Sequence, residues 1–237
     1  MVFNRMVNTV IILDNIVFNM DAAELRRRLR IPDASRHAEQ LRPLLLEAQS
    51  VARPKALYRI AFIDSKFEDA VIVEGTTLTS RVLRVNLDKA HRVFVYVATC
   101  GTELEEWSKS VRGMLERFWA DTIKEMALHS AIGALNNDIK DRYRPGSTAT
   151  MSPGSLEDWP IEQQRPLFAI LGDAAEAIGV RLTDSLLMVP TKSVSGIRFP
   201  TEESFESCQL CPRENCPGRR APFEEGLYER KYQTRTR

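Results

Sequence analysis

The chain has 237 residues, with 33 lysines and arginines against 32 aspartates and glutamates, so its formal net charge is +1. Hydrophobic residues make up 43% of it and charged residues 27%, which is typical of a folded globular protein and argues against a disordered chain. The balanced charge argues against a polybasic nucleic-acid binder. The length supports one or two domains with a sizeable core.

The N-terminal part of the chain predicts two helices followed by four strands. Residues 10–18 are expected to form a strand or a buried turn. The helices are expected over residues 21–28, capped by Asp21, and over 34–52, where Pro43 should kink or break the helix. Stretches rich in β-branched and aromatic residues predict strands at 57–64, 70–74, 81–87 and 92–99.

Two amphipathic helices are predicted after Gly101. The first begins with Thr102 and Glu105 at capping-box spacing, and the second covers roughly residues 121–142. Apolar residues recur in both at helical intervals, so we expect these residues to belong to the core. In the first helix they are Leu104, Trp107, Val111, Met114, Leu115 and Phe118.

Residues 144–160 change in character, because glycine, proline and serine are frequent and no apolar period is visible. A loop of this length in a folded domain is often functional. A helix over about 161–179, stopped by Gly179, and two strands at 180–189 and 193–199 are expected to follow.

Taken in order, these elements predict an α+β fold with a largely antiparallel, twisted sheet. We assign residues 1–199 to this domain and residues 200–237 to a cysteine-containing tail that packs on the same domain.

The chain shows no pattern that predicts a membrane span. Its longest apolar stretch near the start, residues 7–20, is interrupted by asparagines and an aspartate, whereas a spanning helix needs about 20 mostly apolar residues. The same stretch lacks the shape of a signal peptide. We therefore expect a cytoplasmic protein that binds neither a membrane nor a nucleic acid.

Three of the four cysteines form a C-x2-C-x4-C motif at Cys208, Cys211 and Cys216. Thiolates at this spacing can hold one metal from a tight turn, and clustered cysteines in a reducing compartment more often indicate metal than disulfides. Three sulfur ligands leave a tetrahedral zinc site, or a cubane cluster, one ligand short. A surface loop with incidental thiols is the alternative.

The fourth cysteine, Cys100, follows the strand predicted at 92–99 and precedes a helix. The partial positive charge at a helix N-terminus favours a thiolate, so Cys100 has the electrostatics of a fourth ligand. We predict that Cys100, Cys208, Cys211 and Cys216 converge on one metal centre, a [4Fe-4S] cluster or, as the alternative, zinc. Spacing alone does not choose between the two.

Several short motifs resemble one known family. The sequence S-P-G-S-L-E-D-W-P at residues 152–160 is similar to the S-P-G-Y and D-W-P segment that leads into a helix in the activation domain of cobalamin-dependent methionine synthase. Residues 182–185 (L-T-D-S) and 188–196 (M-V-P-T-K-S-V-S-G) resemble its L-T-E-S and M-x-P-x-x-S-V-S-G stretches, and residues 99–105 resemble its strand-to-helix turn. The cysteine tail resembles stand-alone relatives of this domain found with corrinoid methyltransferase systems.

The resemblance implies a domain that binds S-adenosylmethionine, docks on a corrinoid-carrying partner and supports the reduction of its Co(II) to Co(I). An alignment on Ser152 to Gly154 puts Thr150 where the family has an arginine and Ser155 where it has a tyrosine. A second alignment restores the arginine as Arg142. The residues expected to bind S-adenosylmethionine are Arg142, Pro153, Gly154 and Ser155.

Two functions of different classes therefore remain open. The first is an activator of a corrinoid methyltransferase protein, in which a cluster relays an electron to Co(II). The second is a non-catalytic docking module whose tail is held together by zinc. An S-adenosylmethionine methyltransferase is the weaker alternative, because no glycine-rich turn follows a strand. The three histidines are scattered and no acid/base pair is recognisable, so whether the protein is an enzyme is left open.

Overall fold

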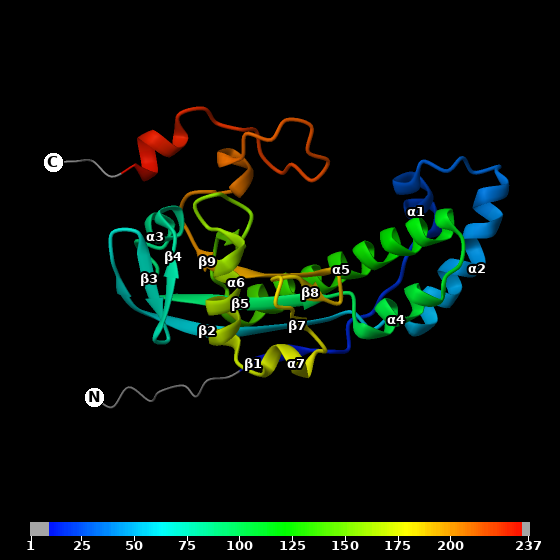
Figure 1. Cartoon of the computed structure of the whole chain (residues 1–237), viewed down its shortest axis with the longest axis horizontal. Helices are drawn as coiled ribbons and strands as arrows, with labels where there is room; N and C mark the ends of the chain where they lie inside the picture. The colour runs from blue at the N-terminus through cyan, green and yellow to red at the C-terminus, as the bar shows by residue number, and fades with distance from the viewer. Residues whose placement is uncertain (1–9, 234–237) are drawn as a thin grey trace.

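The structure is a computed structural model that describes residues 10–233. Its centre is a sheet with strand order β4-β3-β2-β5-β9-β6, to which β1 is added by its pairing with β2 (Figure 1). All of these pairings are antiparallel. The strands are β1 (Val10–Leu13), β2 (Lys55–Lys66), β3 (Ala70–Val73), β4 (Thr76–Thr79), β5 (Arg92–Thr99), β6 (Thr148–Met151) and β9 (Ser193–Pro200). The predicted α+β fold with an antiparallel sheet is confirmed.

Helices cover both faces and one end of this sheet. They are α1 (Ala22–Leu29), α2 (Arg36–Val51), α3 (Arg81–Asn86), α4 (Thr102–Ser110), α5 (Met114–Tyr143), α6 (Gln164–Leu171) and α7 (Ala174–Ala177). A separate two-stranded hairpin consists of β7 (Arg181–Leu182) and β8 (Met188–Val189). No helix of residues 10–233 is long and apolar enough to cross a membrane.

The long helix α5 joins two parts of the molecule. Its 30 residues span roughly 45 Å at 1.5 Å per residue. The N-terminal half packs Trp119, Ile123 and Ala127 against α1, α2 and α4. The C-terminal half lays Ala131, Leu135 and Ile139 on one face of the sheet, over aromatic side chains of β2 and β5.

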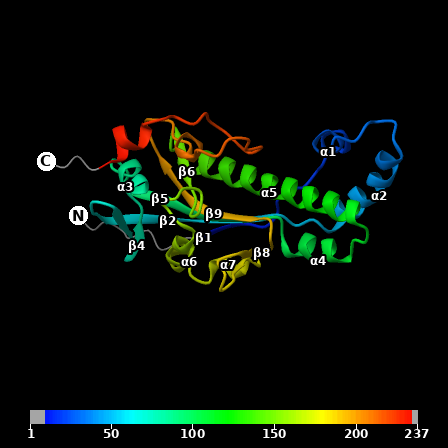
Figure 2. The same cartoon turned by 45° about the horizontal axis from the view of Figure 1, so that its top comes forward.

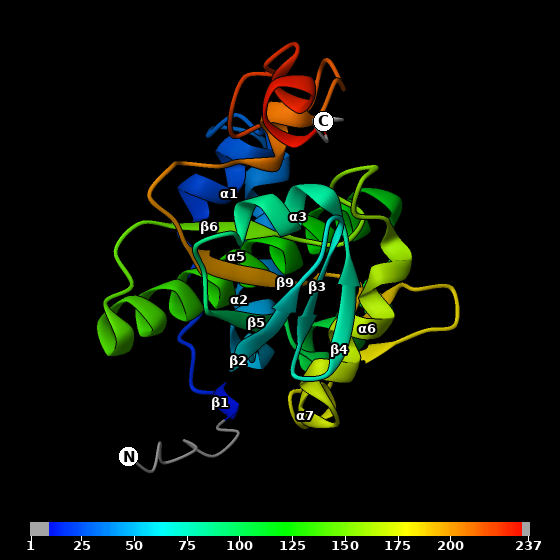
Figure 3. The same cartoon turned by 90° about the vertical axis from the view of Figure 1, so that its left-hand side faces the viewer.

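The other face of the sheet packs against α3, α6 and the tail. This larger core contains Leu167 and Ile170 of α6, and the tail contributes two buried aromatic side chains, Phe205 and Tyr232. Figure 2 shows α5 on one side of the sheet and α6 with α7 on the other, and Figure 3 shows the tail along the edge near α3 and β6. The tail is thus anchored in the main core.

Residues 81–87, predicted as a strand, form helix α3 instead. The Oγ of Ser80 accepts a hydrogen bond from the backbone N–H of Leu83 at 2.9 Å, which caps the helix. Val82 and Leu83 are fully buried. A local cap together with burial on the helical face outweighs the β-branched composition of this stretch. The missed strand is β4, which pairs with β3 just before the cap.

The helix predicted to continue past Ser110 stops there, and α5 begins at Met114 after Gly113, whose φ is +89°. Met114, Leu115 and Phe118 are 91%, 41% and 61% exposed, so the prediction that these three residues belong to the core is wrong. The predicted capping box is also wrong. Gly101 is the N-cap of α4, and no side chain caps this helix end.

Three further boundaries differ from expectation. Helix α2 runs through Pro43 without a break. The helix expected over 161–179 is divided into a short 3-10 turn, α6 and α7, because Gly172, with a φ of +60°, ends α6. The strand expected over 180–189 is the β7–β8 hairpin, and the loop over 144–160 contains the edge strand β6.

Candidate functional site

The turn at residues 152–155 is held in place by the segment that follows it. Gly154 has a φ of +81°, a conformation that favours glycine, and its N–H donates to the carbonyl of Trp159 at 2.8 Å. The N–H and the Oγ of Ser155 both donate to the carbonyl of Ser152, at 3.1 and 2.6 Å. Because Trp159 is fully buried, these bonds fix the turn to the core.

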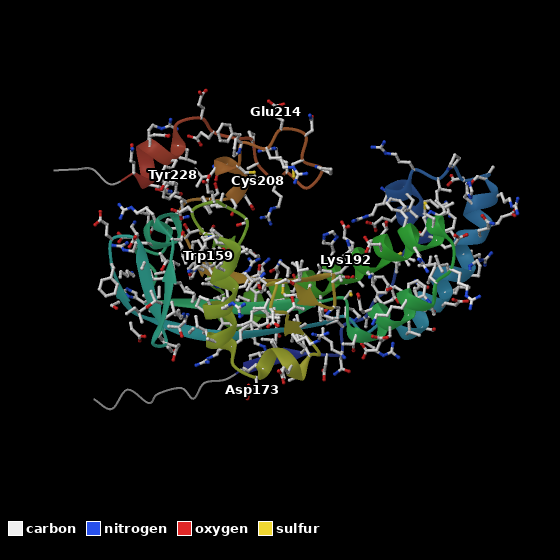
Figure 4. All side chains as sticks on the ribbon, in the orientation of Figure 1. Trp159, Asp173, Lys192, Cys208, Glu214 and Tyr228 are labelled. Carbon is white, nitrogen blue, oxygen red and sulfur yellow. The ribbon has the colours of Figure 1, made fainter. Side chains whose placement is uncertain are left out.

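The tail lies against this turn. The Oγ atoms of Ser155 and Ser207 are 3.5 Å apart, and Ser207 is buried. Figure 4 shows Cys208 and Tyr228 in the tail, with Trp159 below them. The loop singled out by sequence resemblance and the cysteine tail therefore meet in space.

Asp158, in the D-W-P motif, links the same segment to α3 and to the tail. Its Oδ2 accepts hydrogen bonds from the hydroxyl of Ser80 and from the N–H of Val82, the latter at 3.0 Å. Its Oδ1 is 3.4 Å from the hydroxyl of Tyr228. This carboxylate stabilises the start of a helix and is not free for acid/base chemistry.

Gly196 of β9 allows three backbone segments to come close together. A Cβ placed there would lie 2.5 Å from the carbonyl oxygen of Met151, 2.7 Å from the Oγ of Ser152 and 2.9 Å from the hydroxyl of Tyr96. The hydroxyl of Tyr96 hydrogen bonds with the side chain of Ser152. Burial raises the pKa of Tyr96, so this hydroxyl keeps its proton.

Arg198 lies two residues further along β9, on the same face as Gly196. It is the cross-strand partner of Thr150, the position that the family alignment leaves without an arginine. Its Nη1 donates to the Oγ1 of Thr148 at 2.6 Å, while its Nε is buried without a hydrogen-bond partner in the part of the chain that is described. Burial lowers the pKa of Arg198, although the guanidinium stays charged.

The tail adds two charges whose electrostatic effect reaches Arg198. Arg220 Nη2 and Glu206 Oε2 form an ion pair at 3.0 Å, and the charges of both residues act on Arg198. The charge of Arg220 also acts on Tyr96. Strands β5 and β9, the turn and the tail thus contribute to one polar surface. We call it the Arg198 cluster, and it consists of Tyr96, Ser152, Gly196, Arg198, Glu206 and Arg220.

Sequence reasoning singled out the turn but missed Arg198 and Tyr96. The available signal was a single arginine between two apolar residues in a predicted strand, Ile197-Arg198-Phe199. A charged side chain in a strand next to the core usually needs a partner. Which residues surround that arginine depends on the strand order, which the sequence does not reveal.

Arg142 is not brought to this cluster. Its Nε donates to both carboxylate oxygens of Asp138, each at 2.8 Å, on the exposed side of α5. Asp138 Oδ2 in turn accepts a hydrogen bond from the hydroxyl of Tyr58, on β2, at 2.6 Å. In the sheet order, β5 lies between β2 and β9, so the strand that carries Arg198 is two strand spacings, or roughly 10 Å, from β2.

Cys100 lies in the core between α1, α2, α4 and α5 and is fully buried. Burial raises its pKa to about 12, because desolvation outweighs the favourable helix end and disfavours the expected thiolate. Its N–H donates to the carbonyl of Lys192 at 2.9 Å. Figure 4 shows Lys192 well apart from Cys208. The structure therefore does not bring Cys100 to the three tail cysteines.

The tail cysteines lie in a loop that one arginine organises. The guanidinium of Arg219 donates to the carbonyls of Cys208, Cys211 and Arg213, of which the first two bonds are 3.1 and 3.2 Å long. Hydrogen bonding to the Cys208 sulfur, led by the backbone N–H of Arg220 at 3.4 Å, lowers the pKa of that thiol.

The donor chemistry of this loop suits a soft metal, but its geometry does not yet form a ligand set. Among residues 10–233, no three histidine, cysteine or acidic side chains gather closely enough to hold a metal ion. The predicted centre with four cysteines is not present in this arrangement.

A buried ion pair positions the M-V-P-T-K segment. Lys124 Nζ lies 3.1 Å from Glu105 Oε2, and the same oxygen accepts a hydrogen bond from the hydroxyl of Thr191 at 3.0 Å. Burial opposes the charge of Glu105, but the hydrogen bonds from Lys124 and Thr191 keep its pKa below the ordinary value. This pair explains why Glu105 is engaged here and not at the end of its helix.

Two comparisons relate the chain to known proteins. Residues 139–210 match the family model described as the activation domain of vitamin B12 dependent methionine synthase. The fold resembles the crystal structure of the MetH reactivation domain bound to AdoHcy, with a TM-score of 0.59 and 13% sequence identity over 85% of this chain and 82% of that chain. No curated protein matches the sequence. Residues 139–210 are thus similar in sequence to the activation domains of vitamin B12 dependent methionine synthase, and the chain shares the fold of the solved reactivation domain.

Proposed function

We propose that the protein activates a corrinoid-carrying partner and binds S-adenosylmethionine while doing so. The matched segment, residues 139–210, contains the turn at 152–155, and most of the Arg198 cluster lies in or beside it. The solved reactivation domain with this fold is bound to AdoHcy, the product that remains when S-adenosylmethionine gives up its methyl group. The observation that carries the proposal is the polar surface that forms where this turn meets β9.

The reaction needs two reactants besides the corrinoid, an electron donor and a methyl donor. A low-potential reductant supplies one electron to Co(II) on the partner, and S-adenosylmethionine supplies the methyl group that traps the resulting Co(I). The residues of this chain bind and orient the methyl donor at the Arg198 cluster and the turn Pro153 to Ser155. Because the chain holds no recognisable acid/base pair in the cluster, its contribution is positioning.

A binding measurement and a spectroscopic one test this proposal together. Titration calorimetry should detect S-adenosylmethionine binding to the purified chain. A corrinoid protein in its Co(II) state, mixed with the chain, S-adenosylmethionine and a chemical reductant, should regain the visible spectrum of methyl-cobalt. Omission of the chain is the control. Absence of binding in calorimetry contradicts the proposal and favours a non-catalytic docking module.

The activator must distinguish the states of its partner. A protein that bound the Co(II) and the methylated corrinoid equally could not bias the partner towards reactivation. We therefore expect tighter binding to the Co(II) form. Equal affinities in a titration of both forms contradict activation and are compatible only with passive docking.

We also propose that the tail binds a metal through Cys208, Cys211 and Cys216, without Cys100. The support is the motif spacing, the N–H group directed at the Cys208 sulfur and the lowered pKa of that thiol. A [4Fe-4S] cluster and zinc are the two candidates, and iron with acid-labile sulfide in anaerobically purified protein distinguishes them. No step of the proposed reaction depends on this metal.

A further inference from the structure

The most unusual charge in the structure is Arg198. Arg198 is half-buried, its Nε atom is buried without a hydrogen-bond partner, and the residue forms no ion pair with any carboxylate among residues 10–233. Its single hydrogen bond uses one of the five N–H donors of a guanidinium. The desolvation of this Nε–H group is not compensated within residues 10–233, which favours an anion from outside the described chain as its partner.

The surroundings of Arg198 favour an anion of limited size. Arg220 brings a second guanidinium from the tail, while Glu206 neutralises one of the two positive charges. Tyr96 and Ser152 bring hydroxyl groups, and the absence of a side chain at the buried Gly196 lets both hydroxyl groups pack closely against the backbone of β9. Two guanidinium groups with one acidic neighbour leave one net positive charge, which matches a single carboxylate.

We propose that Arg198 binds the carboxylate of the amino-acid part of S-adenosylmethionine and that Arg220 of the tail completes this subsite. The inference rests on the proposed function. It adds two elements that neither the family match nor the motifs provide. The anion-binding arginine comes from β9 and not from the loop at 142–155, and the cysteine tail forms part of the ligand site.

The role of the tail follows from its connections. Arg220 offers its side chain to Glu206 and its backbone N–H to the sulfur of Cys208, so the position of the second guanidinium depends on the cysteine loop. Phe205 anchors the start of the tail in the main core. A ligand bound at Arg198 therefore contacts the folded domain and the tail at the same time.

The test compares two ligands that differ only in the carboxylate, S-adenosylmethionine and decarboxylated S-adenosylmethionine, by titration calorimetry with the full chain. A charge-assisted contact corresponds to a difference in affinity of about 10- to 100-fold. We expect Arg198→Gln to lose that factor for S-adenosylmethionine and to leave the affinity for the decarboxylated ligand unchanged. Arg220→Gln should lose a smaller factor in the same selective manner.

Arg142→Gln is the matched control, since Arg142 is exposed and already paired with Asp138, and it should bind both ligands as the wild type does. Arg198→Lys keeps the charge and should recover part of the selectivity, and unchanged melting temperatures show that the variants fold. If Arg198→Gln weakens both ligands equally or neither, the carboxylate subsite is refuted while the proposed function stands. If the wild type binds neither ligand, the proposed function itself fails.

Discussion

Gly196→Ala is the sharpest test of how the candidate site is built. The new methyl carbon would lie 2.5 Å from the carbonyl oxygen of Met151, which is about 0.9 Å closer than the 3.4 Å at which ordinary contact begins. This oxygen belongs to the backbone of β6, the strand paired with β9, so it cannot move as a flexible side chain does. The strands have to separate, or the turn at Ser152 has to shift.

The expected cost is that of overpacking a well-packed position, about 1–3 kcal/mol in the free energy of unfolding. For a chain of this size that corresponds to a drop in melting temperature of roughly 2–12 °C. Because the same methyl group would press on the Oγ of Ser152 and on the hydroxyl of Tyr96, S-adenosylmethionine binding should also weaken. Differential scanning calorimetry and a binding titration measure the two effects.

The control is Gly133→Ala, in the middle of α5, where a Cβ meets no atom within 4 Å. Alanine is the better helix former, so this variant should be at least as stable as the wild type. A Gly196→Ala protein that melts and binds ligand like the wild type would show that β6, β9 and the turn are not packed as described.

Three further outcomes are expected. Lys124→Ala should lower the free energy of unfolding by about 3–5 kcal/mol in chemical denaturation, because it leaves the buried Glu105 carboxylate without its positively charged partner; a loss below 1 kcal/mol would contradict the buried pair. In the folded protein the pKa of Glu105 is below its ordinary value of 4.5. The ionised carboxylate therefore contributes to stability above about pH 4.5, and this contribution is lost as the pH falls below that value. Glu105→Gln should reduce the decrease in the free energy of unfolding that acid causes. Cys211→Ser should remove bound metal measured by elemental analysis, whereas Cys100→Ser should retain it; equal loss of metal in both variants would restore Cys100 as a ligand.

Local patterns in the sequence predicted those features that depend on neighbours along the chain. The composition of 57–64 and 92–99 predicted two strands; the first lies within β2 and the second coincides with β5. The C-x2-C-x4-C spacing and the S-P-G and D-W-P motifs were visible for the same reason, and they indicated the family to which residues 139–210 match.

Expectations that depended on burial were less successful. The stretch 81–87 has the composition of a strand, but Ser80 caps it as a helix and the core accepts its apolar face. The start of a helix next to Cys100 favours a thiolate, but full burial raises the pKa of the thiol. The same burial places Cys100 in the core and not at the tail. Desolvation is a property of the folded environment, which a short sequence window does not contain.

Only the tertiary structure assembled the Arg198 cluster. Its members come from β5, the turn after β6, β9 and the tail, and they meet because β9 pairs with both β5 and β6 while Phe205 anchors the tail nearby. The sequence by itself determined which segments can form strands and which residues carry charge. Strand order decided which of those charges are neighbours, because contacts across a sheet join residues that are far apart in the chain.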